Sequence, residues 1–423
     1  MQKLLKKLWS NIFFRGGVFY TASSILANVM NLLFNLIIGH SISLSGYGEL
    51  TALFSYLTVL TVPMLVFSNY LIHKIAGATD TIVLAKSLEN LLWKYTRRWF
   101  FVIPLLFFLT PLISKLTNLS LFLTFTLILF AISTIISSVY SSLLQGLQLF
   151  LIFSVLGVVL TFIKLLGAIL VLFGLDGLFT IISFLFLSTI LGILVSIRVF
   201  RSHVKLKSTN IQSVPVIQKK LIHLLKNPQF QLISLSTFAL TIFNNADVMF
   251  VQKYFASSAV GIYSSWSLFS KIIFYILGPF ISISFIFFSS RQSQNNERKT
   301  LHISLVALLA VGIAGFIAYK YLALPILYIV YGGNKFYAVA PFLAKASIFG
   351  SLYTGVTFIN NFFLAKRSWI SSISFISMFL YIILLFFVKR DLSSVMNLNI
   401  FFSAGLFITY VVLYIKFFLI KKN

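Results

Sequence analysis

The sequence predicts an all-α polytopic membrane protein with about 12 transmembrane helices, arranged as two parallel six-helix halves around a central cavity. Hydrophobic residues make up 59% of the chain and charged residues 9%, with a mean hydropathy of +1.02, whereas soluble domains carry about a quarter charged residues. Apolar runs of about 18 residues or more recur along the whole length, and each can cross a bilayer as a helix. The runs are continuous and rich in Leu, Ile and Phe, which favours helices over the short alternating strands of a β-barrel.

Twelve candidate spans follow one another along the chain. They lie near residues 17–39, 49–71, 99–114, 119–143, 150–173, 177–198, 229–252, 262–289, 301–323, 338–364, 369–388 and 397–420. Lys and Arg gather on the cytoplasmic side of membrane proteins, so their distribution gives the orientation. With the N-terminus inside, the inner segments hold 24 of the 33 Lys and Arg residues, the outer segments hold 6, and three lie inside spans. Both termini are therefore predicted to be cytoplasmic.

The polar residues exclude several classes of function. The net charge of +26 reflects the topology and attraction to anionic lipid headgroups, so membrane lipids, and not nucleic acid, are the expected partners. The absence of cysteine excludes disulfides, thiolate metal sites and cysteine nucleophiles. The five histidines lack metal-ligand spacing, and the sequence shows no nucleophile–base arrangement. We therefore expect no catalytic residue, no metal and no cofactor.

The longest polar connection separates six predicted spans from six others. It predicts an N-terminal six-helix bundle at 1–198, a basic cytoplasmic linker at 199–228 and a C-terminal six-helix bundle at 229–423. Because six is an even number of spans, both halves start on the same side of the membrane and form a parallel repeat.

Each half opens with a similar pattern of residues. LSGYGEL precedes the span that contains Pro63, and AVGIYSS precedes the span that contains Pro279. The distance from Tyr47 to Pro63 is 16 residues, and so is the distance from Tyr263 to Pro279. Proline in a span frees a backbone carbonyl and permits a bend, so these four residues are candidate gating positions. A static kink filled by neighbouring side chains is the alternative.

Four ionisable side chains fall inside spans, where a charge costs about 2.5–3.5 kcal/mol on insertion scales. Lys164, Lys271, Lys345 and Asp247 each lie about 10–14 Å from the outer end of their span, at 1.5 Å per helical residue. One interpretation is a buried ion pair between Asp247 and Lys271 that holds a helical hairpin together. The other is a positively charged layer, with a net charge of about +2, that binds a diphosphate in a cavity of low dielectric.

Asn244 and Asn245 stand beside Asp247 in the same span. Their amides can bind phosphate or sugar hydroxyls, and we predict both as substrate-binding residues together with the three span lysines. Hydrogen bonding between helices is the alternative role for these amides. Asp247 is the carboxylate that we place in a span core, and therefore the candidate for coupling to a proton or sodium gradient. The membrane potential is another possible driving force.

Six motifs extend over nearly the whole chain: RGGVFYTASSIL, ISLSGYGEL, SSLLQGLQLF, NNADVMFVQKYFASSAVGIYS, IVYGGNKFYAVAPFL and NNFFLAKRS. In order and spacing the chain resembles the polysaccharide-biosynthesis flippases, the Wzx type of the multidrug/oligosaccharidyl-lipid/polysaccharide exporter superfamily. The resemblance implies alternating access and transport of an undecaprenyl-pyrophosphate-linked oligosaccharide across the bacterial inner membrane. It also implies a role in making O-antigen lipopolysaccharide, capsule or a related glycan, with polymerase and chain-length proteins as pathway partners.

Three alternatives stand beside this prediction. A cation-coupled multidrug exporter shares the fold, but the span lysines outnumber the span carboxylate three to one, which argues for an anionic substrate. A lipid II flippase is a relative that usually has fourteen spans. A membrane polymerase or glycosyltransferase usually needs a large acidic or metal-binding loop, and the segment 199–228 contains no Asp or Glu.

Overall fold

A computed structural model describes residues 12–76, 78, 80–98, 100–207, 228–289 and 297–420. These residues fall into two compact units, which we call unit 1 and unit 2. Unit 1 takes the described residues of 1–42, 60–115 and 120–223. Unit 2 takes the described residues of 43–59, 116–119 and 224–423.

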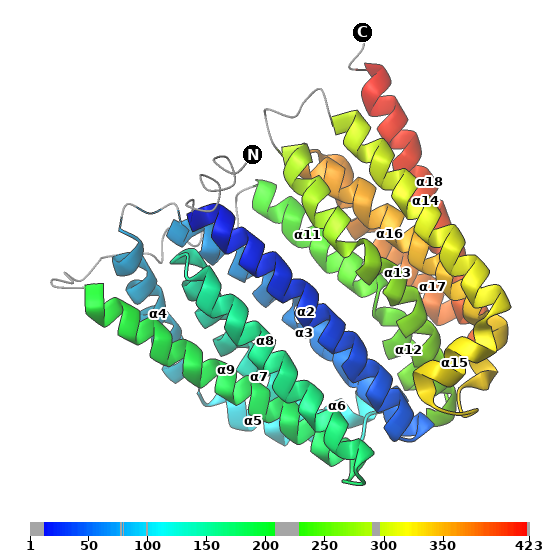
Figure 1. The fold of residues 1–423 in the computed structure, drawn as a ribbon, viewed down its shortest axis with the longest axis horizontal. Helices are drawn as coiled ribbons and strands as arrows, with labels where there is room; N and C mark the ends of the chain where they lie inside the picture. Colours follow the sequence, from blue (N-terminus) through cyan, green and yellow to red (C-terminus); the bar gives the residue numbers. More distant parts are fainter. Residues whose placement is uncertain are drawn as a thin grey trace, which may run out of the picture. The chain divides into compact units, whose positions relative to one another are not determined.

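Unit 1 is a bundle of long apolar helices closed at one end by an amphipathic helix. Helix α8 packs lengthwise against α2 and α9, α7 packs on α9, and α4 contacts both α7 and α9 (Figure 1). The helices are α2 (Ile12–Ser41), the second half of α3 (Leu44–Ala76), α4 (Thr81–Arg98), α5 (Val102–Phe108), α6 (Thr110–Thr117), α7 (Leu121–Gly146), α8 (Phe150–Leu172) and α9 (Gly177–Lys207).

Unit 2 is built around α16 (Leu343–Ala365), a helix with most of its 23 residues buried against α13, α14 and α18. The first half of α3 also belongs to this unit. The remaining elements are α11 (Pro228–Phe243), α12 (Ala246–Tyr254), α13 (Ser257–Ser289), α14 (Glu297–Tyr321), α15 (Ala323–Tyr331), η2 (Tyr337–Phe342), η3 (Trp369–Ser372), α17 (Ile373–Phe387) and α18 (Leu392–Ile420).

The described residues contain 10 helices long and apolar enough to cross a membrane, or 11 if the bent pair α11–α12 counts as one span. Each matches a predicted span, so the all-helical membrane class is confirmed. The predicted span at 99–114 is different, because it consists of the two short helices α5 and α6 with a break at Leu109. Pro111 is the second residue of α6, where a missing backbone N–H costs nothing, so the sequence itself favours a new helix there.

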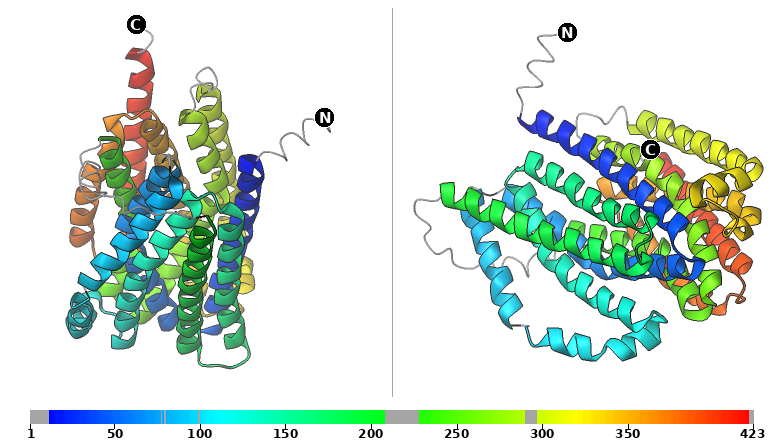
Figure 2. Two further views of the ribbon diagram at one scale, coloured as in Figure 1. Left: turned by 90° about the vertical axis from the view of Figure 1, so that its left-hand side faces the viewer. Right: turned by 60° about the horizontal axis from the view of Figure 1, so that its bottom comes forward.

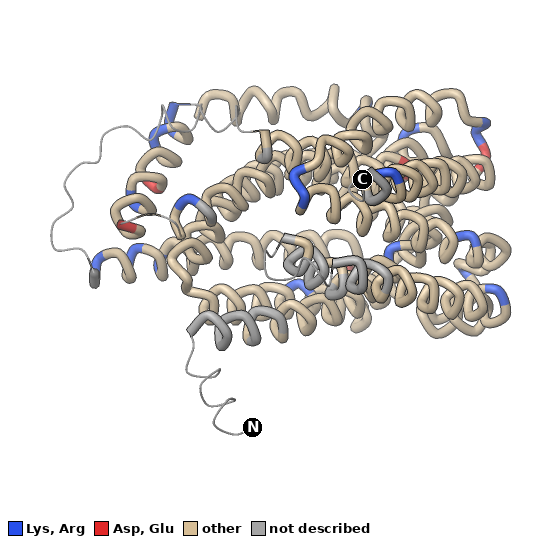
Figure 3. Tube along the Cα trace, turned by 90° about the horizontal axis from the view of Figure 1, so that it is seen from above, with Lys and Arg blue, Asp and Glu red and all other residues tan. Residues whose placement is uncertain are grey.

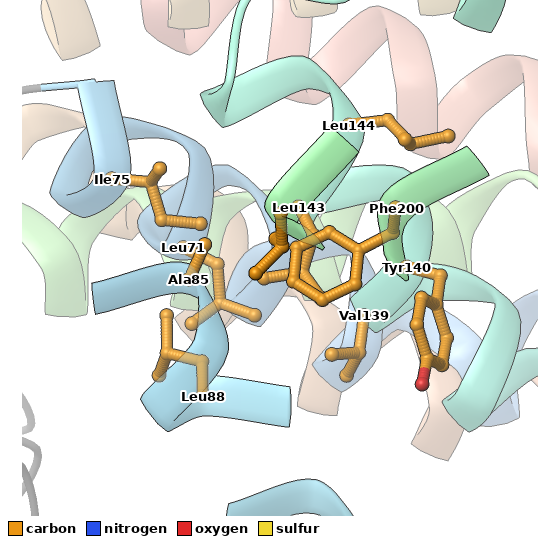
Figure 4. Close-up of a cluster of buried hydrophobic side chains, with 10 residues drawn as sticks. Leu71, Ile75, Ala85, Leu88, Val139, Tyr140, Leu143, Leu144 and Phe200 are labelled. Carbon is orange, nitrogen blue, oxygen red and sulfur yellow. The ribbon is translucent and has the colours of Figure 1, made fainter. Parts of the chain in front are cut away.

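Helix α4 lies in the segment 72–98 between two predicted spans, for which no helix was predicted. It is an 18-residue amphipathic helix whose buried side chains are Ala85, Leu88 and Glu89. Two of them join Leu71, Val139 and other apolar residues of α3, α7 and α9 in a compact cluster (Figure 4). Figure 2 shows α4 (light blue) and the following α5–α6 pair (cyan) running in different directions.

The predicted linker at 199–228 is helical at its beginning. Residues 199–207 continue α9 to Lys207, and residues 208–227 lie outside the described part of the chain. Residues 43–59 of the predicted N-terminal bundle group with unit 2. The predicted division at 1–198 and 229–423 stays a prediction.

Candidate functional site

The span that carries Asp247 is broken two residues earlier, at Asn244 and Asn245. Helices α11 and α12 meet there at an angle of 41°. Asparagine side chains compete with the backbone for hydrogen bonds and weaken a helix interior. Here the Asn245 Nδ2 donates to the carbonyl oxygen of Thr241 at 2.8 Å, which satisfies a backbone acceptor near the break. The two adjacent asparagines therefore explain why this apolar segment bends.

Asp247 lies in the first turn of α12, where the partial positive charge of a helix N-terminus favours a carboxylate. Its side chain is only 1% exposed. The Oδ2 atom accepts hydrogen bonds from the Tyr263 hydroxyl at 2.7 Å and from the Asn399 Nδ2 at 2.9 Å. Tyr381 donates to the Asn399 Oδ1 at 2.6 Å, so residues from α12, α13, α17 and α18 form one buried polar network. The Asp247 Oδ1 atom has no hydrogen-bond partner among the described residues.

Lys271 does not form the ion pair with Asp247 that one interpretation of the sequence predicts. Within the described part of the chain the salt bridges involve only Glu89. The Lys271 Nζ lies instead 3.5 Å from the Asn245 Oδ1, a long contact with a neutral amide. The Asp247 carboxylate is held by Tyr263, which precedes Lys271 on α13 by about two helical turns. Asp247 and Lys271 therefore form no direct ion pair, but their charges are near enough to interact.

Lys345 also meets an amide. Its Nζ lies 2.9 Å from the Asn397 Oδ1 and 3.5 Å from the Ser393 hydroxyl, both on α18. The ammonium is 5.7 Å from the centre of the Phe342 ring. The side chain is half-buried and joins α16 to α18.

Lys164 belongs to unit 1 and repeats the arrangement there. Its Nζ donates to the Asn31 Oδ1 at 2.9 Å and lies 4.1 Å from the centre of the Phe34 ring, both on α2. Each of the three span lysines thus has an asparagine oxygen as a close neighbour. Figure 3 shows that most of the trace is uncharged. That the three lysines line a common cavity stays a prediction.

No family model and no curated protein matches the sequence. The structure of the lipid II flippase MurJ, in an inward closed conformation, superposes with a TM-score of 0.70 at 16% identity, covering 94% of this chain and 87% of that one. An inward-facing MATE multidrug resistance transporter of the MOP superfamily gives a TM-score of 0.65 at 14% identity, over 91% of this chain and 92% of that one.

A third solved structure is that of the MATE multidrug transporter DinF-BH. It gives a TM-score of 0.62 at 13% identity, covering 98% of this chain and 95% of that one. The chain therefore has the same fold as these three transporters. The many apolar helices and this fold identify a multi-pass membrane protein.

The predicted gating residues occupy different environments in the structure. Pro63 lies inside the continuous helix α3 and is exposed, and Pro279 lies in α13 with its side chain outside the described residues. Tyr47 is 2% exposed and packs edge-on against the rings of Tyr331 and Phe336. Tyr263 has the polar role described above, so the two equivalent tyrosines of the repeat differ. A gating role for these four residues stays a prediction.

The two repeat motifs touch each other within unit 2. A Cβ atom added at Gly48 would lie 2.7 Å from the backbone nitrogen of Gly261. A Cβ atom added at Gly261 would lie 2.1 Å from the carbonyl oxygen of Leu44. The glycines of LSGYGEL and AVGIYSS therefore allow the first turns of α3 and α13 to pack backbone against backbone.

Several residues of this site were not predicted from the sequence. Asn31, Asn397 and Asn399 were missed as partners of charged residues, and Tyr381 was missed as a partner of Asn399. Amides within apolar runs are the feature that could have found the asparagines, and NLN at 397–399 places two of them in one span. Glu49 was placed at the edge of its span and lies within α3, half-buried.

Proposed function

We propose that the protein is a transporter that moves an undecaprenyl-pyrophosphate-linked oligosaccharide outward across a bacterial inner membrane by alternating access. The observation that supports it is that the ammonium groups of Lys271 and Lys345 lie against asparagine oxygens and form no direct ion pair with a described residue, although the Asp247 charge still acts on Lys271. An amide oxygen stabilises an ammonium without cancelling its charge. In a low dielectric such charges attract a diphosphate strongly.

The substrate class has support from two directions. A solved structure with this fold is named a lipid II flippase, which favours a lipid-linked substrate for this chain. The sequence resemblance favours a surface-polymer precursor for O-antigen, capsule or a related glycan. The polymerase and chain-length proteins of that pathway would then take the product in the outer leaflet.

A cation-coupled multidrug exporter is the second candidate, because MATE transporters have the same fold. The buried Asp247 with its unpartnered Oδ1 favours binding of a cation or a proton at this point. In the flippase the same atom would be the coupling site. Active uptake of an organic cation by inverted vesicles containing the protein would support the exporter instead.

The lysines are tested by surface-polymer export in a strain that lacks the chromosomal gene and carries a plasmid copy. We expect Lys271→Ala and Lys345→Ala each to reduce export about tenfold, since a hydrogen bond to a charged phosphate is worth about 1.5–3 kcal/mol. Lipid-linked precursor should accumulate in the inner leaflet.

Lys320→Ala is the matched control, because this lysine is exposed at the end of α14. Export by this variant should equal that of the wild type. Full export by Lys271→Ala and Lys345→Ala at normal protein levels would contradict the charge-binding role of the lysines.

Asp247→Asn tests the coupling role in the same strain. The substitution keeps the shape of the side chain and a hydrogen-bonding oxygen for Tyr263, but it removes the titratable group. We expect export to become independent of the proton or sodium gradient and to fall strongly. Export that keeps its normal response when each gradient is dissipated would show that Asp247 is not the coupling site.

A further inference from the structure

Unit 1 contains a basic pocket between α4 and α9 that the proposed transport cycle does not use. Its volume is about 850 Å³. The basic side chains Lys86, Lys94, Arg97 and Arg201 line it, together with Trp93 and Leu194. A single carboxylate, that of Glu89, also lines it, so the pocket has a surplus of three positive charges.

The charges come from one face of α4. Lys86, Asn90, Trp93 or Lys94, and Arg97 follow one another at three- or four-residue steps, the spacing of one helix face. The opposite face carries Ala85 and Leu88, which are packed in the apolar cluster with α7 and α9 (Figure 4). Burial of that cluster therefore fixes the basic face toward the pocket.

Glu89 positions two of the basic side chains of the pocket, and its single negative charge leaves most of their positive charge uncompensated. Its carboxylate accepts from the Lys86 Nζ at 2.5 Å, from the Arg201 Nε at 2.8 Å and from the Tyr140 hydroxyl at 2.8 Å. Burial alone would raise the pKa of Glu89, but the hydrogen bonds from Lys86, Arg201 and Tyr140 outweigh it and hold the pKa below its ordinary value. The ionised carboxylate thus holds two of the cations in place.

Lys94 and Arg97 are exposed and form no hydrogen bond or ion pair with any described residue. Arg201 donates its Nε to Glu89 and its side chain is 54% exposed, so the guanidinium can still reach a further acceptor. Two free cations beside a fixed guanidinium make a site for a phosphate oxygen, which arginine binds with particular strength.

The apolar part of the pocket favours an amphiphile over a soluble anion. Leu194 is 56% exposed, and Ile197 lies one turn further toward Arg201, both within a helix that is apolar enough to span a membrane. The indole of Trp93, which lines the pocket, donates to the Tyr140 hydroxyl at 3.0 Å and so holds the ring at the pocket wall. Basic residues are therefore next to surface that acyl chains would cover.

We propose that this pocket binds the phosphate headgroup of an anionic membrane lipid, with its chains lying along α9. The predicted orientation places it in the cytoplasmic leaflet, where basic pockets between helices bind anionic headgroups. The lipid is a bound partner of unit 1 and is distinct from the transported substrate.

Native mass spectrometry of the purified full-length protein tests this proposal. The probes are phosphatidylglycerol, phosphatidylcholine with the same chains, and glycerol phosphate as a headgroup without chains. We expect phosphatidylglycerol to bind, and the double variant Lys94→Ala/Arg97→Ala to weaken it at least about tenfold. Neither residue has a partner among the described residues, so the variant should remain folded.

Arg98→Ala is the matched control, since Arg98 is exposed on the same helix and does not line the pocket. It should change the affinity by less than about twofold. Equal losses from Arg98→Ala and from the double variant, or no loss from either, would overturn the proposal. Glycerol phosphate that binds as tightly as phosphatidylglycerol, or phosphatidylcholine that binds equally well, would overturn the lipid assignment. Transport is not measured, so this result is independent of the proposed function.

Discussion

At the scale of single residues, the membrane part of this protein handles charge by pairing cations with amides. Lys164, Lys271 and Lys345 each lie near an asparagine oxygen. Burying a cation beside a carboxylate would have produced an inert pair, with a desolvation cost that often exceeds its Coulombic gain. A neutral partner lowers the cost of burying the ammonium and leaves its field available to a ligand.

Glu89 lies outside the membrane-spanning helices, and there a buried charge is paired directly with charges of opposite sign. Its side chain is 1% exposed and accepts hydrogen bonds from two cations and a tyrosine. Because the folded-state pKa is lowered from its ordinary value of 4.5, the ionised group stabilises the fold above that value. This stability is lost as the pH falls through the lowered pKa.

We therefore expect Glu89→Gln to reduce the free energy of unfolding by about 1.5–3 kcal/mol at pH 7, the value of a hydrogen bond to a charged group. The difference between variant and wild type should shrink as the pH is lowered below the ordinary carboxyl pKa. Thermal unfolding in detergent at a series of pH values measures both effects.

Asp80→Asn is the control at the start of the same helix. Asp80 is exposed and its Oδ1 accepts from the backbone nitrogens of Ile82 and Val83, a cap that asparagine also provides. Removing this charge should leave stability nearly unchanged. A Glu89→Gln variant as stable as Asp80→Asn at pH 7 would refute the role given to the Glu89 network.

At the scale of elements, the breaks in helices are as informative as the helices. Two asparagines end α11 and open α12, and they place Asp247 at a helix N-terminus inside the membrane part of the chain. A proline lies at another helix break, since Pro111 is the second residue of α6 and follows the break at Leu109. Pro63 does not interrupt its helix, since α3 continues through it. A proline in a span therefore did not by itself predict a break.

The close contact between α3 and α13 predicts that a side chain added at either glycine lowers the stability of the protein. We expect Gly261→Ala to destabilise the protein by about 1–3 kcal/mol or more, because its methyl group would meet the Leu44 carbonyl and overpack the contact. Gly48→Ala should act in the same direction, with Gly261 as the obstructing residue. Thermal unfolding of the purified variants in detergent is the measurement.

Gly405→Ala supplies the comparison. A Cβ atom at this position in α18 meets nothing within 4 Å, and alanine is the better helix former by about 1 kcal/mol. Stability should stay the same or increase. If Gly261→Ala also leaves the unfolding temperature unchanged, the close approach of the two helices is not required.

At the scale of the whole molecule, the distribution of basic residues predicts an orientation that labelling can measure. The chain has no cysteine, so single cysteines can be introduced without background. Lys205 and Lys389 are both exposed, on segments predicted to lie on opposite sides of the membrane. A membrane-impermeant maleimide should label Lys389→Cys in spheroplasts and Lys205→Cys only after lysis. Labelling of Lys205→Cys in intact spheroplasts would reverse the predicted topology.

The sequence by itself determined the class of this protein and the approximate positions of most of its spans. Hydropathy is a local property, since about 20 consecutive apolar residues meet the requirement of the bilayer wherever they occur. The break at Asn244 and Asn245 was not predicted, because the apolar run suggested one continuous span at 229–252 and the two amides were interpreted as binding residues. Helix α4 was missed because its basic face resembles a cytoplasmic loop, and its apolar face is recognised only at helical periodicity.

Only the tertiary structure decided which side chains meet. In the structure Asp247 accepts hydrogen bonds from Tyr263 and Asn399, and Lys271 contacts Asn245. The sequence had placed Asp247 and Lys271 on neighbouring helices at similar depth. The structure also joined Lys345 to Asn397, 52 residues away along the chain. The depth of a residue follows from its count along the helix. Its direction follows from how the helix is rotated about its own axis, and that rotation is set by packing against every neighbouring helix at once.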